Sequence, residues 1–247
     1  MKASAFEFRF RFWIFVLVYT LGFVTPWDLA WHLDGSGPNT HVWARLAMLL
    51  YKDAGVAIGT AFNVVLIAGI VCAGVGAWMR TWGSAYLGVD VMSDRNLRSD
   101  GVVANGPYRY VRNPLYEGVW IHTLALALLM PTSGAIFTLV SVIAFQLRLI
   151  LGEEEFLRAK LGEPYVEYCA KVPRLLPSPR PRVAASGAHP RWLQAALAEI
   201  FMWGMTASFA VLGWQYDAHL LLRCVLVWLG VSLILRAART RERPVTA

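Results

Sequence analysis

The chain has 247 residues, of which 57% are hydrophobic and only 16% charged. A soluble domain has about 25% charged residues, so the composition excludes an ordinary soluble domain and indicates an integral membrane protein. The net charge of +7 does not indicate a nucleic-acid partner here, because the distribution of charge along such a chain matters more than its sum. The three cysteines and five histidines are scattered, so we expect neither a disulfide framework nor a zinc site.

An apolar run needs about 20 residues to cross a bilayer, or somewhat fewer where the membrane thins. Six runs qualify, in chain order Phe12–Leu33, Ala54–Met79, Leu115–Met130, Ser133–Leu151, Leu193–Trp214 and His219–Leu235. The first lacks a cleavage site and is expected to remain as a span. Val42–Tyr51 is a short amphipathic piece, and Pro131 predicts a tight hairpin between the third and fourth runs. We therefore expect an all-α polytopic membrane bundle of about six transmembrane helices.

The basic residues divide unequally between the two sides of this bundle. With both termini inside, 20 of the 23 Lys and Arg residues fall on one face, which is the positive-inside pattern. Two long polar segments, 80–113 and 152–191, then share the cytoplasmic face and can meet in space. We expect an integral membrane protein with both termini cytoplasmic, in a bacterial inner membrane.

The first of these segments ends in "GPYRYVRNPLYEG", residues 106–118. Asn113 followed by Pro114 is a strong helix start, because Asn can cap a helix and Pro fits its first position. The free N–H groups and positive dipole end of that helix would favour an anion, and Arg109 and Arg112 add positive charge. Arginine and tyrosine are also common at a membrane boundary, so an interfacial anchor is the alternative interpretation.

The second segment, 148–177, carries three adjacent carboxylates at the end of an apolar helix. Glu153 is closest to the membrane, and burying it uncompensated would cost several kcal/mol, so it needs a partner or a function. Gly162 followed by Pro164 predicts that the helix ends at Leu161. Tyr165 and Tyr168 would share one face of the next helical turn.

Three stretches of the chain together resemble the isoprenylcysteine carboxyl methyltransferase and phospholipid N-methyltransferase superfamily. They are, in chain order, "GAWMRTWGSAYLG", "GPYRYVRNPLYEG" and "EEEFLRAKLGEPYVEYCAKVPRLLP". The resemblance covers about residues 71 to 177. It departs from the family at Asn113, where the family usually has His, so an imidazole role is not available. On this basis we divide the chain into an N-terminal span with an amphipathic segment (1–53), a membrane methyltransferase core (54–180) and a two-span extension (192–247).

The resemblance implies an S-adenosylmethionine-dependent methyltransferase with a cofactor pocket on the cytoplasmic face. The cofactor supplies an activated methyl group, so the protein mainly has to position donor and acceptor. The helix start would suit the carboxylate of the cofactor. Glu153 would suit a cationic group or the ribose hydroxyls of the cofactor, and Tyr108 would form a hydrogen bond to it or stack on it. The expected cofactor-binding residues are Asp100, Gly101, Val102, Val103, Tyr108, Arg112, Asn113, Pro114, Leu115, Tyr116 and Glu153.

The expected acceptor is a lipophilic carboxylate, amine or thiol that enters from the bilayer. Arg148 would pair with an acidic lipid or with Glu153, and Glu154 would act as a base if the acceptor is an amine. We therefore take Arg148 and Glu154 as the candidate catalytic residues.

Two alternatives remain open. One is a membrane sterol-type reductase, in which Arg95, Arg98, Arg109 and Arg112 would bind the 2′-phosphate of NADPH. The other is a non-catalytic lipid-binding membrane protein. The cofactor that binds, which is S-adenosylmethionine, NADPH or none, distinguishes the methyltransferase from these two alternatives.

Overall fold

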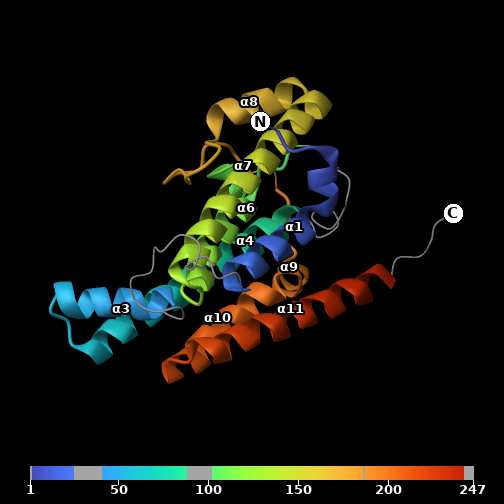
Figure 1. Ribbon diagram of the computed structural model, residues 1–247. Helices are drawn as coiled ribbons and strands as arrows, with labels where there is room; N and C mark the ends of the chain where they lie inside the picture. The colour runs from blue at the N-terminus through green and yellow to red at the C-terminus, as the bar shows by residue number, and fades with distance from the viewer. Residues whose placement is uncertain (1, 25–40, 88–101, 186, 242–247) are drawn as a thin grey trace.

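The computed structural model describes residues 2–24, 41–87, 102–185 and 187–241, and every regular element in these ranges is a helix (Figure 1). The α-helices and two 3₁₀ helices (η) are α1 (Ala5–Val24), α3 (Val42–Asp53), α4 (Ile58–Leu87), η1 (Gly106–Arg109), α6 (Pro114–Ala127), α7 (Thr132–Leu161), α8 (Glu163–Lys171), α9 (Trp192–Ala198), α10 (Ile200–Leu212), η2 (Gly213–Gln215) and α11 (Ala218–Arg241). The all-α prediction is confirmed.

Within the described ranges, three helices are long and apolar enough to cross a membrane: α4, α7 and α11. The bent pair α9 and α10 adds a fourth if it forms one span. Helix α6 has only 14 residues, and α1 ends at Val24, so the rest of the predicted first span lies outside the described residues. The apolar helices agree with an integral membrane protein, whereas the count of six spans stays a prediction.

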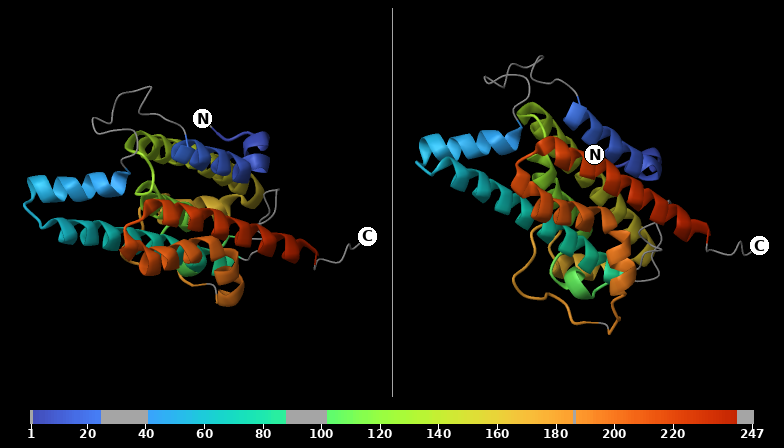
Figure 2. Two further views of the ribbon diagram at one scale, coloured as in Figure 1. Left: turned by 60° about the horizontal axis from the view of Figure 1, so that its bottom comes forward. Right: turned by 90° about the horizontal axis from the view of Figure 1, so that it is seen from below.

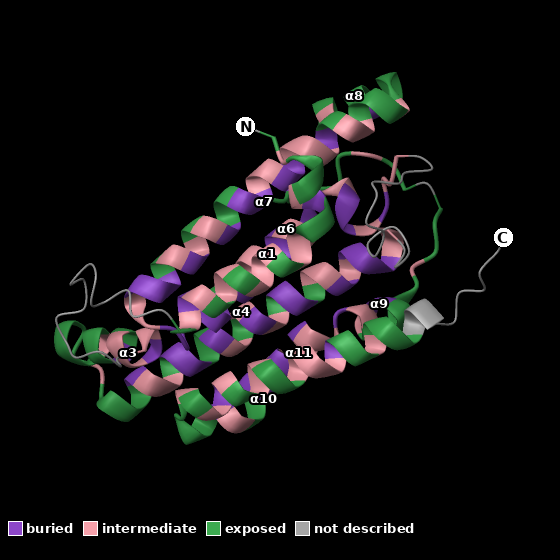
Figure 3. Ribbon diagram, turned by 45° about the vertical axis from the view of Figure 1, so that its right-hand side comes forward, coloured by how far each residue is buried: buried purple, intermediate pink, exposed green. Residues whose placement is uncertain are grey.

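The helices lie side by side, with α4 and α6 between the pair α1 and α7 and the pair α10 and α11 (Figure 2). The main core cluster joins α3, α4, α6, α10 and α11. Helix α11 is largely exposed along its apolar length (Figure 3). An exposed apolar face of this kind is suited to lipid rather than to water.

The predicted hairpin at Pro131 is present, with Pro131 immediately before α7. Helix α7 runs for 30 residues and ends at Leu161, just before Gly162, whose φ of 64° is readily adopted by glycine. The predicted helix end at Leu161 is confirmed. Because α7 does not break, it extends from the bundle core to Glu153 and Glu154 at one end of the molecule.

The predicted span Leu193–Trp214 is not one straight helix. It is divided at Glu199 into α9 and α10, which are bent by 72° relative to each other. The Glu199 carboxylate binds Arg80 and Ser84 of α4, and this polar contact lies at the break.

Small residues let α4 and α6 approach closely. A Cβ atom at Gly76 would lie 2.7 Å from the carbonyl oxygen of Gly118, and one at Gly118 would lie 2.6 Å from Cγ of Arg80. Side chains at these positions would separate the helices, as expected for small-residue contacts between membrane helices. The close crossing brings Arg80 against the start of α6, where its Nη1 donates to the carbonyl of Leu115 at 3.3 Å.

Candidate active site

The segment 106–113 runs antiparallel to residues 173–182. The N–H of Arg112 donates to the carbonyl of Pro173 at 2.9 Å, and the N–H of Ser178 donates to that of Tyr110 at 3.0 Å. The N–H of Arg182 donates to the carbonyl of Arg109 at 2.8 Å. The two polar segments that the charge pattern assigns to one face therefore meet through their backbones.

Glu154 is the centre of a cluster that we call the Glu154 clamp, made with Arg112, Asn113 and Arg174. Its Oε1 lies 3.1 Å from Nη1 of Arg112, and its Oε2 lies 2.8 Å from Nη2 of Arg174. The side-chain amide of Asn113 donates to Glu154 at 3.3 Å and to the carbonyl of Arg174 at 3.2 Å. Both oxygens of the Glu154 carboxylate are occupied by arginines, so the surroundings of Glu154 suit a structural anchor better than a base.

Asn113 does precede the first residue of α6, as predicted, but its side chain makes no capping hydrogen bond. Pro114 has no N–H, and the N–H groups of Tyr116 and Glu117 both donate to the Asn113 carbonyl. The helix start therefore offers fewer free N–H donors to an anion than the sequence suggested, because those of Tyr116 and Glu117 are already used.

Glu153 points to a different environment from Glu154, although the two are adjacent on α7. It is half-buried and accepts a hydrogen bond from the hydroxyl of Tyr116 at 2.9 Å. Tyr116 also packs against an apolar cluster of Phe8, Phe145 and Leu149 on α1 and α7. The contact between Tyr116 and Glu153 therefore joins a polar group to an apolar surface.

Tyr108 is the third member of this polar region. Its ring is 7% exposed, and its buried hydroxyl has no hydrogen-bond partner among the described residues. The charges of Glu153, Arg80 and Glu199 all act on it. Burial raises the pKa of the Tyr108 phenol well above its usual value, so it remains a hydroxyl donor at neutral pH.

A second ion pair lies on the α4 side of Tyr108. Nε of Arg80 is 2.6 Å from Oε2 of Glu199, Nη2 is 2.9 Å from Oε1, and the hydroxyl of Ser84 donates to Oε1 at 2.9 Å. The side chains of Arg80 and Glu199 are 18% and 5% exposed. The sequence analysis did not select this pair. The sequence signal for this pair was Glu199, a single acidic residue within a predicted span, because such a residue usually has a functional or structural partner.

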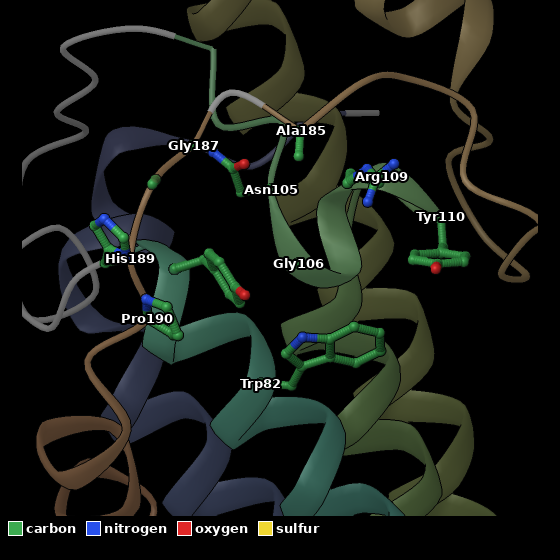
Figure 4. A pocket seen from close by; sticks show the side chains of 11 residues that line it. Trp82, Asn105, Gly106, Arg109, Tyr110, Ala185, Gly187, His189 and Pro190 are labelled. Atoms are coloured by element: carbon green, nitrogen blue, oxygen red, sulfur yellow. The ribbon is translucent and has the colours of Figure 1, made fainter.

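A pocket of about 440 Å³ lies between the end of α4, residues 105–110, and residues 185 and 187–190 (Figure 4). We call it the rim pocket. Its lining includes the aromatic side chains of Trp82, Tyr86 and Tyr110 and the polar side chains of Asn105, Arg109 and His189. Figure 4 shows Trp82 and Tyr110 on one side and His189 with Pro190 on the other. The pocket therefore combines flat apolar faces with donors and one fixed positive charge.

Gly106 forms part of the pocket wall and has a φ of 53°. A Cβ atom there would overlap the ring of Tyr86. Both the backbone conformation and the close approach require glycine, so this residue fixes the position of η1 over the end of α4.

The remaining predicted residues lie in varied places. Asp100 and Gly101 are outside the described residues, and Val102 packs near Tyr165 and Tyr168 rather than in the rim pocket. Arg148 does not contact Glu153. Its guanidinium binds Glu7 of α1, with Nη2 2.9 Å from Oε2. The structure therefore brings Tyr108, Asn113, Tyr116, Glu153 and Glu154 to one end of the bundle and ties Arg148 to α1.

Two tyrosines of α8 pack against this end of the bundle. Tyr165 and Tyr168 are buried, pack against each other and share a face, as predicted. The hydroxyl of Tyr168 donates to the carbonyl of Tyr108 at 2.8 Å, and burial raises the pKa of Tyr168 above its usual value. This hydrogen bond fixes the backbone of η1 next to the rim pocket.

Residues 64–163 match the family model described as phospholipid methyltransferase. The match confirms the resemblance to membrane methyltransferases found in the sequence, and it extends from α4 to the first residue of α8. Comparison with curated proteins and with solved structures gave no match.

Proposed function

We propose that this membrane protein, whose residues 64–163 match the phospholipid methyltransferase family, transfers a methyl group from S-adenosylmethionine to a lipophilic acceptor in the bilayer. The observation that carries the proposal is the convergence of residues 106–118 with residues 148–178 at one end of the bundle. The buried hydroxyl of Tyr108, which has no hydrogen-bond partner among the described residues, and the carboxylate of Glu153, which accepts from the hydroxyl of Tyr116, both belong to that end. We place this end, and both termini, on the cytoplasmic face.

The residues present fit S-adenosylmethionine. The cofactor presents an adenine, a ribose, a carboxylate and an ammonium group, and it supplies an activated methyl group that needs no further activation by the protein. In the rim pocket the aromatic side chains suit the adenine and Arg109 suits the carboxylate. Glu153 does not line that pocket, but at the same end of the bundle its carboxylate suits the ribose hydroxyls or the ammonium. The buried hydroxyl of Tyr108, which has no hydrogen-bond partner among the described residues, is a further donor at this end of the bundle.

We place the acceptor in the bilayer beside α1 and α7, next to Tyr116. Because Tyr116 contacts both Glu153 and the buried cluster of Phe8, Phe145 and Leu149 between these helices, an acyl chain along their outer side would bring its polar end towards Glu153. If the acceptor is an amine, it must lose a proton before it can act as a nucleophile. Glu153 is better suited to accept that proton than Glu154, which already holds two arginines.

The test uses the purified full chain in detergent with methyl-labelled S-adenosylmethionine and a native lipid extract. We expect the label to appear in a lipid identified by mass, and we expect Glu153→Gln and Tyr108→Phe each to weaken S-adenosylmethionine binding about tenfold, the effect of losing a buried hydrogen bond to a charged or polar ligand group. Glu163→Gln is the matched control, because Glu163 is exposed on α8.

Unchanged cofactor affinity in both variants would reject this placement of the cofactor. Binding of NADPH in place of S-adenosylmethionine would favour the reductase. Of the arginines considered for that alternative, Arg112 is already held by Glu154, Arg109 lines the rim pocket, and Arg95 and Arg98 lie outside the described residues.

A further inference from the structure

Glu117 is a buried carboxylate that the candidate active site does not use. It lies in the first turn of α6, four residues after Asn113, and is 6% exposed. Among the described residues it forms no ion pair, unlike Glu154 and Glu199, which are held by arginines. Burying a carboxylate costs free energy unless hydrogen bonds replace the lost water, so Glu117 needs a partner at this position.

The partner of Glu117 is a backbone N–H from the second polar segment. Its Oε1 accepts the N–H of Leu176 at 3.0 Å, across 59 residues of sequence. Leu176 has a φ of 62°, in the left-handed region, which costs free energy for a residue with a branched apolar side chain. The side chain of Leu176 is 82% exposed, so packing does not offset this cost. The hydrogen bond to Glu117 is therefore the contact that holds Leu176 in its conformation.

Leu176 lies between two contacts that join its segment to the candidate active site. Two residues earlier, Arg174 binds Glu154 of the clamp, with Nη2 2.8 Å from Oε2. Two residues later, the N–H of Ser178 donates to the carbonyl of Tyr110 at 3.0 Å, and Tyr110 lines the rim pocket. Because two residues of chain leave little slack on either side, a change of backbone conformation at Leu176 would shift both contacts.

We infer that Glu117 is a positioning residue, which holds residues 174–178 in the backbone conformation on which the Glu154 clamp and the edge of the rim pocket depend. It acts as the hydrogen-bond acceptor for one N–H of a strained residue, and its role requires an oxygen at that place rather than a charge or a base. As a statement about the backbone, the inference is independent of the reaction. As a statement about cofactor binding, it rests on the proposed function.

The experiment measures amide hydrogen exchange at Ser178 in the purified full chain by mass spectrometry. Pro177 and Pro179 carry no N–H, so the signal of this amide is not mixed with those of its immediate neighbours. Glu117→Ala should accelerate the exchange about tenfold, the effect of losing a hydrogen bond to a charged group. Glu117→Gln keeps an acceptor oxygen and should stay within about twofold of the unmodified chain. Glu163→Ala removes an exposed carboxylate on α8 and is the matched control, which should have no effect.

A second substitution tests the strain at Leu176. Glycine adopts a φ near 60° without steric cost, so Leu176→Gly should restore most of the protection when it is added to Glu117→Ala. The inference is overturned if Glu117→Ala exchanges like the unmodified chain, if Glu117→Gln exchanges as fast as Glu117→Ala, or if Leu176→Gly restores nothing.

Binding of S-adenosylmethionine to the same variants separates this inference from the proposed function. The affinity should fall about threefold or more in Glu117→Ala and should be retained in Glu117→Gln, because the apparent affinity scales with the fraction of molecules in which the segment is in place. If the exchange results are as expected and all variants bind S-adenosylmethionine equally, Glu117 positions the segment as inferred, and the proposed placement of the cofactor beside it is wrong.

Discussion

The buried pair of Arg80 and Glu199 gives the sharpest prediction about stability. It joins α4, which lies in the family-matched segment, to the bend between α9 and α10, which lies outside it. We consider the single variants Arg80→Met and Glu199→Met and the double variant that contains both. Methionine has a similar length and no charge, so the changes remove the electrostatic contact with little loss of volume.

The structure sets the expected size of each effect. The pair is bidentate at 2.6 and 2.9 Å, and both side chains are largely buried. Removing one partner leaves an unpaired charge in a region of low polarity, which costs about 3–5 kcal/mol in the free energy of unfolding. Replacing both by apolar side chains removes the two desolvation penalties together, so the double variant should lie within about 1 kcal/mol of the unmodified chain.

The measurement is unfolding by SDS titration in mixed micelles, followed by far-ultraviolet circular dichroism. Additive changes are expected for independent sites, so a double variant much more stable than the sum of the singles demonstrates coupling between Arg80 and Glu199. If each single variant loses less than about 1 kcal/mol, or if the double variant loses the sum of the two, the charges are not buried against each other and the argument fails.

Two further predictions use the same unfolding assay. Gly76→Ala should destabilise the bundle by about 1–3 kcal/mol because the new Cβ meets the backbone of α6, whereas Gly59→Ala, which meets no atom within 4 Å, should not, and equal effects would contradict the close crossing. The hydrogen bond from Arg148 lowers the pKa of Glu7 to about 2, so the unmodified chain should lose stability as pH falls from about 4.5, its ordinary value, towards 2. Glu7→Gln should lack that part of the pH dependence, and its persistence in the variant would assign it to other groups.

Helix class and helix ends could be predicted from the sequence because they follow from local chemistry. Pro131 precedes the start of α7 and Gly162 follows its end, for reasons local to each residue: the ring of proline and the free backbone of glycine. Both ends of α7 lie where they were predicted. Tyr165 and Tyr168 follow from helical periodicity in the same way. These features need no knowledge of distant residues.

Partners of charged side chains could not be predicted, because they depend on helix packing. Arg148 had Glu153 five residues away in sequence, yet it binds Glu7, which is 141 residues away. Asn113 has the residue type and the position of a helix cap. Its side-chain amide instead donates to Glu154 and to the carbonyl of Arg174. In each case tertiary contact overrode a local preference.

The pattern of these partners bears on the choice of the functional carboxylate. Glu7, Glu154 and Glu199 each accept hydrogen bonds from an arginine on another element, so their charges are used in holding the bundle together. Glu153 instead accepts from the hydroxyl of Tyr116, with Arg11 adding positive charge nearby. A carboxylate whose neutralisation is less complete has more to gain from a ligand cation or hydroxyl than one held by a guanidinium. The same sequence that places three acids side by side therefore gives Glu153 and Glu154 different uses, and the difference arises from which helix each one faces.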